Sequence, residues 1–520
     1  MKRLSFCAWA AVCGALFTLA PDATAAGTIR VAANAEIRGT NPGVNRDANT
    51  DTVMLHMIEG LVGYRDDGTP APLLASSVQV SKDGKAYTFK LRPGVKFHNG
   101  AALTSADVVW AWKRYLDPNT KWLCLAEFDG SQSLKIESVE ATDPMTVVFK
   151  LNQARPLFLT QIASFQCGSA AIIHKDSVNA DGSWKAPIGT GPYKLGEWKR
   201  GEWIELNAFK DYKSAPGPRD GYVGDKKPIA DTIRWIVVKD DASRRAALAK
   251  GQVDLMPGLR PTELTEMGSP PELEIRNAPT MSVNALLIQV KDPVLANPKL
   301  RQAISASLDT RAIASIASGA SGTANASMVP SPSKYHAGPH KVPHKLDPAA
   351  AKKLLAESGY KGEPIKMVTN RRYPDMYDQS VMMQGMLKAA GINVELEVLE
   401  WGTALERYQS GKYQLMSFGY SSRVDPYLVY ESMLGDKAKS PRKVWDNPRA
   451  IALLQKAGEV GEPSARQKIF DEMHAMMLED VPLVVLYNPG DPNGVNRKLE
   501  GFTAWSQSRE RLWGVKPVVN

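Results

Sequence analysis

The sequence predicts an α/β fold, because segments with the period of a half-buried strand alternate with segments that begin and end as helices do. Apolar and polar residues alternate over 87–92 and again over 146–151, which is the period of a strand with one buried face. Between these runs, Thr104 followed three residues later by Asp107 is a pattern that caps the start of a helix. Helices and strands that alternate along a chain favour α/β lobes.

The same alternation continues in the second half of the chain. Residues 244–250 have helical composition, and a short strand is expected over 253–255. A helix is expected between Asp347 and Gly359, since aspartate before proline starts a helix and glycine ends one. A further strand is expected over 393–401, where apolar residues alternate with glutamates.

The N-terminus has the three parts of a secretory signal peptide. Lys2 and Arg3 form a positive start, an apolar run covers 8–20, and 23–25 reads as a small-residue cleavage site. The apolar run is too short to span a bilayer. The sequence therefore predicts that residues 1–25 are removed and that the mature protein is secreted.

Two of the four cysteines lie outside the predicted signal peptide, at Cys124 and Cys167. In an oxidising compartment two cysteines predict one disulfide, and two buried free thiols are the alternative. No CxxC motif for metal or redox chemistry is present.

The sequence contains no convincing catalytic motif. A GxSxG elbow, an HExxH helix, a Walker A loop and a GxGxxG fingerprint are all absent, and 319–322 is one residue short of a hydrolase elbow. A secreted hydrolase is therefore disfavoured, and no cofactor is expected. The net charge is +9, but no block of lysines and arginines marks a nucleic-acid arm.

His336, His340 and His344 are spaced by four residues, which on a helix would align three imidazoles as metal ligands. Prolines and a glycine lie between them, and proline breaks a helix. Solvated loop histidines are the favoured interpretation, with a metal gathered by the loop as the alternative.

Blocks of residues spread in order along the chain resemble the extracellular solute-binding proteins of the peptide/nickel/opine class of ABC importers, the family of the oligopeptide- and dipeptide-binding proteins. They lie at 58–64, 72–75, 87–92, 94–98, 103–109, 116–118, 189–193, 247–255, 301–305, 347–355 and 480–483.

This resemblance implies a periplasmic binding protein with two α/β lobes around a hinge and an inserted accessory domain. A monomer would capture a small organic solute between the lobes and deliver it to the permease and ATPase subunits of the importer. The implied boundaries are 26–59, 173–279 and 489–520 for domain I, 60–172 for the accessory domain II, and 280–488 for domain III. Both cysteines then fall within domain II.

Peptide-binding relatives hold the ligand's ammonium group with an aspartate in a stretch that corresponds to 418–426. Here that position is occupied by Arg423 or, in the other alignment, by Ser422. Arg423 could instead hold a ligand carboxylate, or it could brace the loop by pairing with Asp425. Asp425 could itself be a displaced ammonium anchor, but before proline it more often shapes a turn.

Further pocket residues follow from the same resemblance. Trp401 matches a tryptophan that lines the pocket of peptide-binding relatives, with core packing as the alternative. Tyr420 stands where those relatives have a second tryptophan. Arg372 and Asn34 lie in loops that could face the cleft, although an ordinary surface position is favoured for both.

The resemblance favours a peptide or peptide-like ligand. A carboxylated non-peptide solute, such as an opine, an amino-acid conjugate or an aromatic acid, is the alternative because the ammonium anchor is altered. A nickel chelate would depend on the histidine loop alone. A receptor with a regulatory or chaperone-like role is a further possibility.

Overall fold

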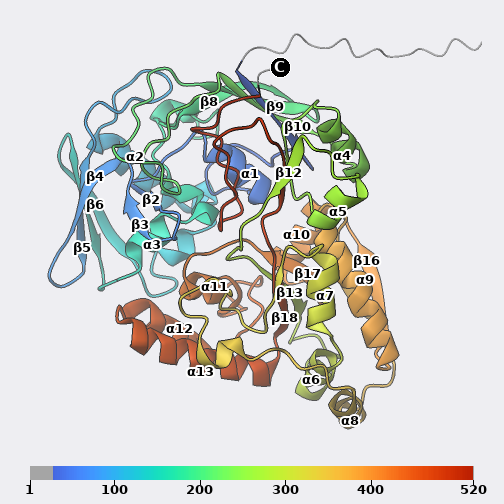
Figure 1. Cartoon of the computed structure of the whole chain (residues 1–520). Helices are drawn as coiled ribbons and strands as arrows, with labels where there is room; N and C mark the ends of the chain where they lie inside the picture. The colour runs from blue at the N-terminus through green and yellow to red at the C-terminus, as the bar shows by residue number, and fades with distance from the viewer. Residues whose placement is uncertain (1–26, 519–520) are drawn as a thin grey trace, which may run out of the picture.

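The computed structural model describes residues 27–518, so the predicted signal peptide lies outside the described residues. Three main sheets organise the molecule, one in each of the three parts visible in Figure 1. Among residues 27–518, no helix combines the length and the apolar character needed to cross a membrane.

The first part is built on a seven-stranded mixed sheet. Its central strand β1 pairs in parallel with β10 and β11, and the remaining pairs are antiparallel. Three distant segments of the chain contribute strands, so the two ends of the chain meet in one sheet. In spatial order the strands are β12 (Leu273–Arg276), β19 (Asn493–Asn496), β11 (Leu255–Pro257), β1 (Thr28–Ala33), β10 (Thr232–Val237), β9 (Trp203–Ala208) and β8 (Tyr193–Lys199). Helices α1 (Ala48–Met54), α4 (Asp241–Ala249) and α5 (Pro261–Glu266) belong to the same part.

The second part is built on a six-stranded sheet with helices on both faces. Alternate residues of β13 enter two different cores: Ala285 and Leu287 one, Leu286 and Ile288 the other. The strands are β14 (Thr323–Ala324), β18 (Leu483–Asn488), β13 (Val283–Ile288), β17 (Leu415–Tyr420), β15 (Ile365–Thr369) and β16 (Val394–Val398). One face is covered by α6 (Pro298–Ala306), α7 (Thr310–Ala317), α8 (Pro348–Ser358) and α9 (Pro374–Ala389). The other is covered by α10 (Trp401–Ser410), α11 (Pro426–Met433), α12 (Pro448–Glu459) and α13 (Pro463–Asp480).

The third part is an antiparallel four-stranded sheet at the side of the first. It is formed by β4 (Ala75–Val80), β5 (Ala86–Leu91), β7 (Thr146–Leu151) and β6 (Ile136–Asp143), with α2 (Ser105–Tyr115) packed against it. The hairpin β2 (Val62–Tyr64) and β3 (Pro70–Pro72) and the short α3 (Phe158–Ile162) connect it to the rest. One continuous core contains Val31 of β1 together with Phe89 and Phe149, so the third part is fused to the first.

The second part has its own cores, and two chain segments join it to the first part side by side. These segments, 277–282 and 489–492, are linked by a bridge between Pro279 and Gly490 and by the hydrogen bond from Asp491 N to Ala278 O (2.9 Å). Two adjacent connections between separately packed bodies are the geometry of a hinge.

The α/β prediction is confirmed, and several elements lie where the sequence pattern places them. Thr104 and Asp107 form the expected capping box at the start of α2, and Gly359 ends α8 in a left-handed conformation. The strand expected over 393–401 is wrong at its end, because β16 stops at Val398 and Trp401 begins α10, which Glu400 caps. The proposed domain boundaries remain a prediction.

The predicted disulfide between Cys124 and Cys167 is present, with the two Cα atoms 5.5 Å apart. It closes a loop within the third part, where both cysteines are buried. Replacing both cysteines by alanine is expected to lower the free energy of unfolding by about 2–4 kcal/mol, because the open loop gives the unfolded chain more freedom. Urea unfolding measures this loss. A thiol assay on the denatured, unreduced protein from residue 26 onward should detect no free thiol, and two thiols would contradict the pairing.

Candidate functional site

A cavity of about 550 Å³ lies between the first and second parts, beside the two hinge segments. Its walls come from segments that are far apart in the sequence. The first part contributes Val44, Asn45, Arg46, Asp47, Ala48, Ser508 and Arg509, the hinge contributes Ser282, Pro489 and Gly490, and the third part contributes Lys121 and Leu123. The second part contributes Asn284, Tyr373, Asp375, Met376, Trp401, Leu405, Tyr408, Gln409, Phe418, Gly419, Tyr420, Ser421, Arg423 and Arg442.

An aromatic wall forms the second part's side of this cavity. The ring of Phe418 stacks on Tyr408 with centroids 4.3 Å apart, and it lies 6.1 Å from Trp401 and 5.1 Å from Tyr420. Tyr373 meets Trp401 edge-on at 5.0 Å. Trp401 is 7% exposed, and its indole N–H has no hydrogen-bond partner among the described residues. The wall therefore offers flat apolar surface and two donors without a partner among the described residues, the Trp401 indole and the Tyr420 hydroxyl.

Positive charge predominates in the lining. Arg46 and Arg509 both pair with Asp51, whereas Arg423 and Lys121 form no salt bridge with any described residue. Arg423 donates only to the carbonyl oxygen of its neighbour Ser421 (2.7 Å), and burial lowers its pKa. A guanidinium held in this way favours an anionic group in the cavity.

The acidic residues of the lining do not offset this charge. The carboxylate of Asp47 caps α1 and lies 3.0 Å from a guanidinium nitrogen of Arg372. Asp375 accepts a hydrogen bond from the Asn284 amide (2.8 Å), and burial raises its pKa.

The structure separates Arg423 from Asp425. The Asp425 carboxylate accepts hydrogen bonds from both terminal nitrogens of Arg466, at 2.6 and 2.9 Å, and caps α11 through the Tyr427 amide. The interpretation of Arg423 as a brace for Asp425 is therefore wrong, because Arg466 on α13 takes that role. Asp425 is not part of the cavity lining, and its charge is neutralised by Arg466, so it is poorly placed as a displaced ammonium anchor.

The other sequence-predicted residues divide between the cavity and its surroundings. Trp401 and Tyr420 line the cavity together with Arg423. Arg372 is not in the lining: its side chain pairs with Asp47, which is, and its carbonyl accepts from the Asn34 amide (3.2 Å). Asn34 lines a smaller neighbouring cavity instead. Contact of these residues with a ligand remains a prediction.

Residues such as Arg46, Asp375, Arg442 and Arg509 also line the cavity, although sequence patterns did not single them out. Each is an isolated charged residue in a loop or at a helix end, and only the tertiary fold brings it to the others. The pairing of both Arg46 and Arg509 with Asp51 has no local sequence signal.

The histidine segment is not the solvated loop that the sequence suggested. His340 is buried: its Nδ1 lies 2.7 Å from the Ser327 hydroxyl, its Nε2 lies 3.1 Å from Asp471, and its ring is 4.7 Å from that of His474. His336 and His344 turn to separate partners, Asn325 and the Ser305 carbonyl. Among residues 27–518, the only three-residue group with metal-ligand spacing is Cys124, Glu127 and Cys167, where the disulfide consumes both thiols.

Burial of His340 and His474 lowers the pKa of each to about 4. Both pKa values lie below the unfolded value near 6.5, so the unfolded state binds more protons between these values and stability is lost as the pH falls from 6.5 towards 4. For His340 the loss is about 3 kcal/mol over that range. Besides each other, the two imidazoles face Asp471 and His336.

Urea unfolding of the protein at pH 7, 6 and 5 measures this dependence. The variant His474→Phe keeps an aromatic ring against His340 but removes one titrating group. Its free energy of unfolding should therefore fall less steeply between pH 7 and pH 5 than that of the wild-type protein. Identical slopes for the two proteins would contradict the assignment.

Comparison with known proteins places the chain in a family. The family model described as bacterial extracellular solute-binding proteins, family 5 (middle) matches residues 69–441. The dipeptide-binding protein of Escherichia coli (strain K12) is 26% identical over 499 residues, which cover 89% of this chain and 90% of the relative. Di/tripeptide-binding protein 4 of Pseudomonas aeruginosa (strain UCBPP-PA14) is 28% identical over 489 residues, with 88% of each chain covered.

A solved structure agrees with these matches over nearly the whole chain. The PBP AgaA of A. tumefaciens R10, in complex with agropinic acid, superposes with a TM-score of 0.83 and 26% identity, covering 95% of this chain and 99% of AgaA. The match spans both lobes and the fused third part. The chain therefore belongs to the bacterial extracellular solute-binding proteins, family 5, which are binding proteins and not enzymes.

Proposed function

We propose that this protein is the periplasmic receptor of an ABC importer for a small peptide or peptide-like solute that carries a carboxylate. One observation carries the proposal: Arg423 lines a cavity between two lobes and has no carboxylate partner among the described residues. An unpaired guanidinium in a closing cleft is costly unless a ligand anion neutralises it. The aromatic wall supplies flat surface for the solute's apolar portion.

The cavity has the size of a small-molecule site, since ligand pockets commonly enclose about 300–1,000 Å³. Relatives named as dipeptide- and di/tripeptide-binding proteins match the chain over almost all of its length, which supports a peptide. Closure of the two parts about the paired hinge segments would enclose the solute and create the surface that a membrane permease and its ATPase recognise.

An opine or another carboxylated non-peptide solute is the second candidate. It is favoured by the absence of an aspartate from the ammonium-binding position of peptide-binding relatives, where Arg423 or Ser422 stands. The likeness to AgaA, solved with agropinic acid, also supports this alternative.

Native mass spectrometry of the protein purified from its own periplasm tests the proposal, followed by a thermal-shift screen of peptides, their C-terminal amides and opines. A bound carboxylated solute should raise the melting temperature, because a ligand of the native state stabilises it. Amidation should abolish the shift. A solute without an acidic group that stabilises the protein equally would overturn the proposal.

A further inference from the structure

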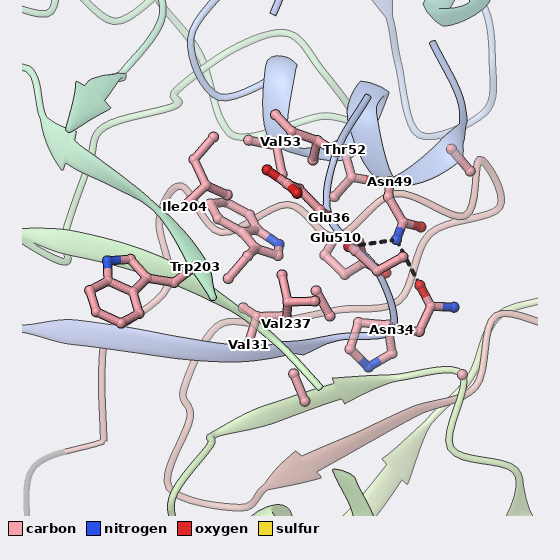
Figure 2. Close-up of a pocket in the computed structure, with 18 of the residues that line it drawn as sticks. Val31, Asn34, Glu36, Asn49, Thr52, Val53, Trp203, Ile204, Val237 and Glu510 are labelled. Atoms are coloured by element: carbon pink, nitrogen blue, oxygen red, sulfur yellow. Dashed lines mark hydrogen bonds between the residues drawn. The ribbon is translucent and has the colours of Figure 1, made fainter. Parts of the chain in front are cut away.

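A second cavity of about 200 Å³ adjoins the first. The two cavities share Ala48, Tyr373 and Ser508 in their linings. The second one lies at the end of β1 and extends between α1 and the strands β9 and β10 (Figure 2). A solute held in the larger cavity could therefore extend one of its ends into the smaller one.

Three tryptophans line this second cavity: Trp198, Trp203 and Trp235. The faces of indole rings carry partial negative charge and attract cations. Cations of the protein already lie over two of these rings, since Arg200 lies 3.4 Å from the centroid of Trp198 and Lys199 lies 4.8 Å from that of Trp203.

Both of these cations have carboxylate partners of their own. Lys199 pairs with Glu202 at 2.8 Å, and Arg200 pairs with Glu36 at 3.2 Å. Because both cations are paired, the smaller cavity has no excess of positive charge, whereas the larger cavity has one.

Glu510 is the charged group of this cavity that has no such partner. It forms no salt bridge with any lysine or arginine of the described residues. Figure 2 shows it with Glu36 near the middle of the pocket, between Asn49 and Thr52 on one side and Val31 and Val237 on the other. A carboxylate and the faces of indole rings both attract a cationic nitrogen, so this cavity offers two kinds of partner for one.

Burial and the nearby charge of Asp491 raise the pKa of Glu510 to about 7, against the opposing effects of Arg509 and of the Thr52 hydroxyl. The pKa of Asp491 is itself raised to about 6 by burial. Glu510 and Asp491 are both only partly exposed, and a cation that enters the cavity beside Glu510 would relieve the repulsion between the two carboxylates.

We propose that the second cavity is a subsite for a positively charged nitrogen group of the solute, with Glu510 and the tryptophan rings as its partners. This inference depends on the proposed function, because the same solute would present its carboxylate to Arg423. The solute is then a zwitterion that spans both cavities. In peptide-binding relatives an aspartate at the position of Arg423 or Ser422 binds the ligand's ammonium group. In this protein Glu510, on the C-terminal segment, would bind it instead.

Alanine peptides of two, three and four residues, each with a free and an N-acetylated amino terminus, test the pairing by isothermal titration calorimetry. For the peptide length that spans both groups, N-acetylation should weaken binding to the wild-type protein by about tenfold or more, the usual effect of losing a charged hydrogen bond in a buried site. In Glu510→Gln the acetylated and free peptides should bind with similar affinity. An unchanged acetylation penalty in Glu510→Gln would overturn the subsite.

Glu500→Gln is the matched control, since Glu500 is an exposed glutamate of the same C-terminal segment and pairs with Lys516. It should retain the wild-type acetylation penalty. If no alanine peptide binds the wild-type protein, the peptide assignment fails, and a second measurement decides on the subsite.

That measurement uses tetramethylammonium and its neutral counterpart of similar shape, tert-butanol, with tryptophan fluorescence as the readout. Tetramethylammonium should cause a saturable change in the wild-type protein and none in Glu510→Gln, and tert-butanol should cause none in either. Binding should be stronger at pH 8 than at pH 6, because Glu510 loses its proton as the pH rises through about 7. A wild-type protein that shows no saturable response overturns the subsite whatever the peptides do.

Discussion

Replacing Arg423 by alanine is expected to weaken the binding of a carboxylated solute by about 2–5 kcal/mol, because a buried, hydrogen-bonded charge pair loses one partner. Arg423 lines the cavity and donates only one hydrogen bond to the protein, to the carbonyl oxygen of Ser421. The rest of its planar fork is available for a bidentate contact. Isothermal titration calorimetry with the solute identified by native mass spectrometry measures the loss.

Two further variants separate recognition of the carboxylate from general effects of charge. Arg423→Lys should recover only part of the affinity, because an ammonium lacks the planar fork. Arg449→Ala removes an exposed arginine on α12 that pairs with Glu472 and is not part of the cavity lining, and this variant should bind as the wild-type protein does. Wild-type affinity in Arg423→Ala would contradict a role for Arg423 in binding.

The elements that the sequence predicted correctly are those whose causes are local. The strand at 146–151 follows from alternation along six residues, and α2 follows from a cap formed by two side chains three residues apart. Trp401 shows the limit of this approach: the alternation of 394–398 ends at Leu399, and Glu400 is not a polar residue of the strand but the cap of the next helix.

The site was harder to predict because its charged side chains pair with residues that are far away in the sequence. Asp425 forms a salt bridge with Arg466, and Arg372 forms one with Asp47. Two residues that the sequence suggested as ligand contacts are therefore paired within the protein. Neither pairing leaves a pattern in the local sequence. The resemblance to a family could indicate that Arg423 replaces an acidic group, but only the fold reveals that Glu510 lies in the adjacent cavity.

The interior of the first part contains a buried ion pair whose loss is expected to lower the free energy of unfolding by an amount similar to the loss of binding free energy in Arg423→Ala. The ammonium group of Lys226 lies 2.8 Å from the Glu59 carboxylate, and neither side chain is exposed. Thr190 and Tyr212 each donate a hydroxyl hydrogen bond of 2.9 Å to this carboxylate. The Lys226 ammonium also lies 3.9 Å from the ring centroid of Tyr222, and burial lowers its pKa.

Lys226→Met is expected to lower the free energy of unfolding by about 3–5 kcal/mol, because it leaves the Glu59 charge buried without a cation. In the double variant Glu59→Gln, Lys226→Met, the glutamine can still accept from Thr190 and Tyr212 and carries no charge, so part of the stability should return. Lys516→Met removes one partner of an exposed pair and should cause no measurable change. Urea unfolding of the four proteins measures these differences. A double variant less stable than Lys226→Met would show that the cost comes from lost packing of the lysine side chain against Tyr222 and not from the uncompensated charge of Glu59.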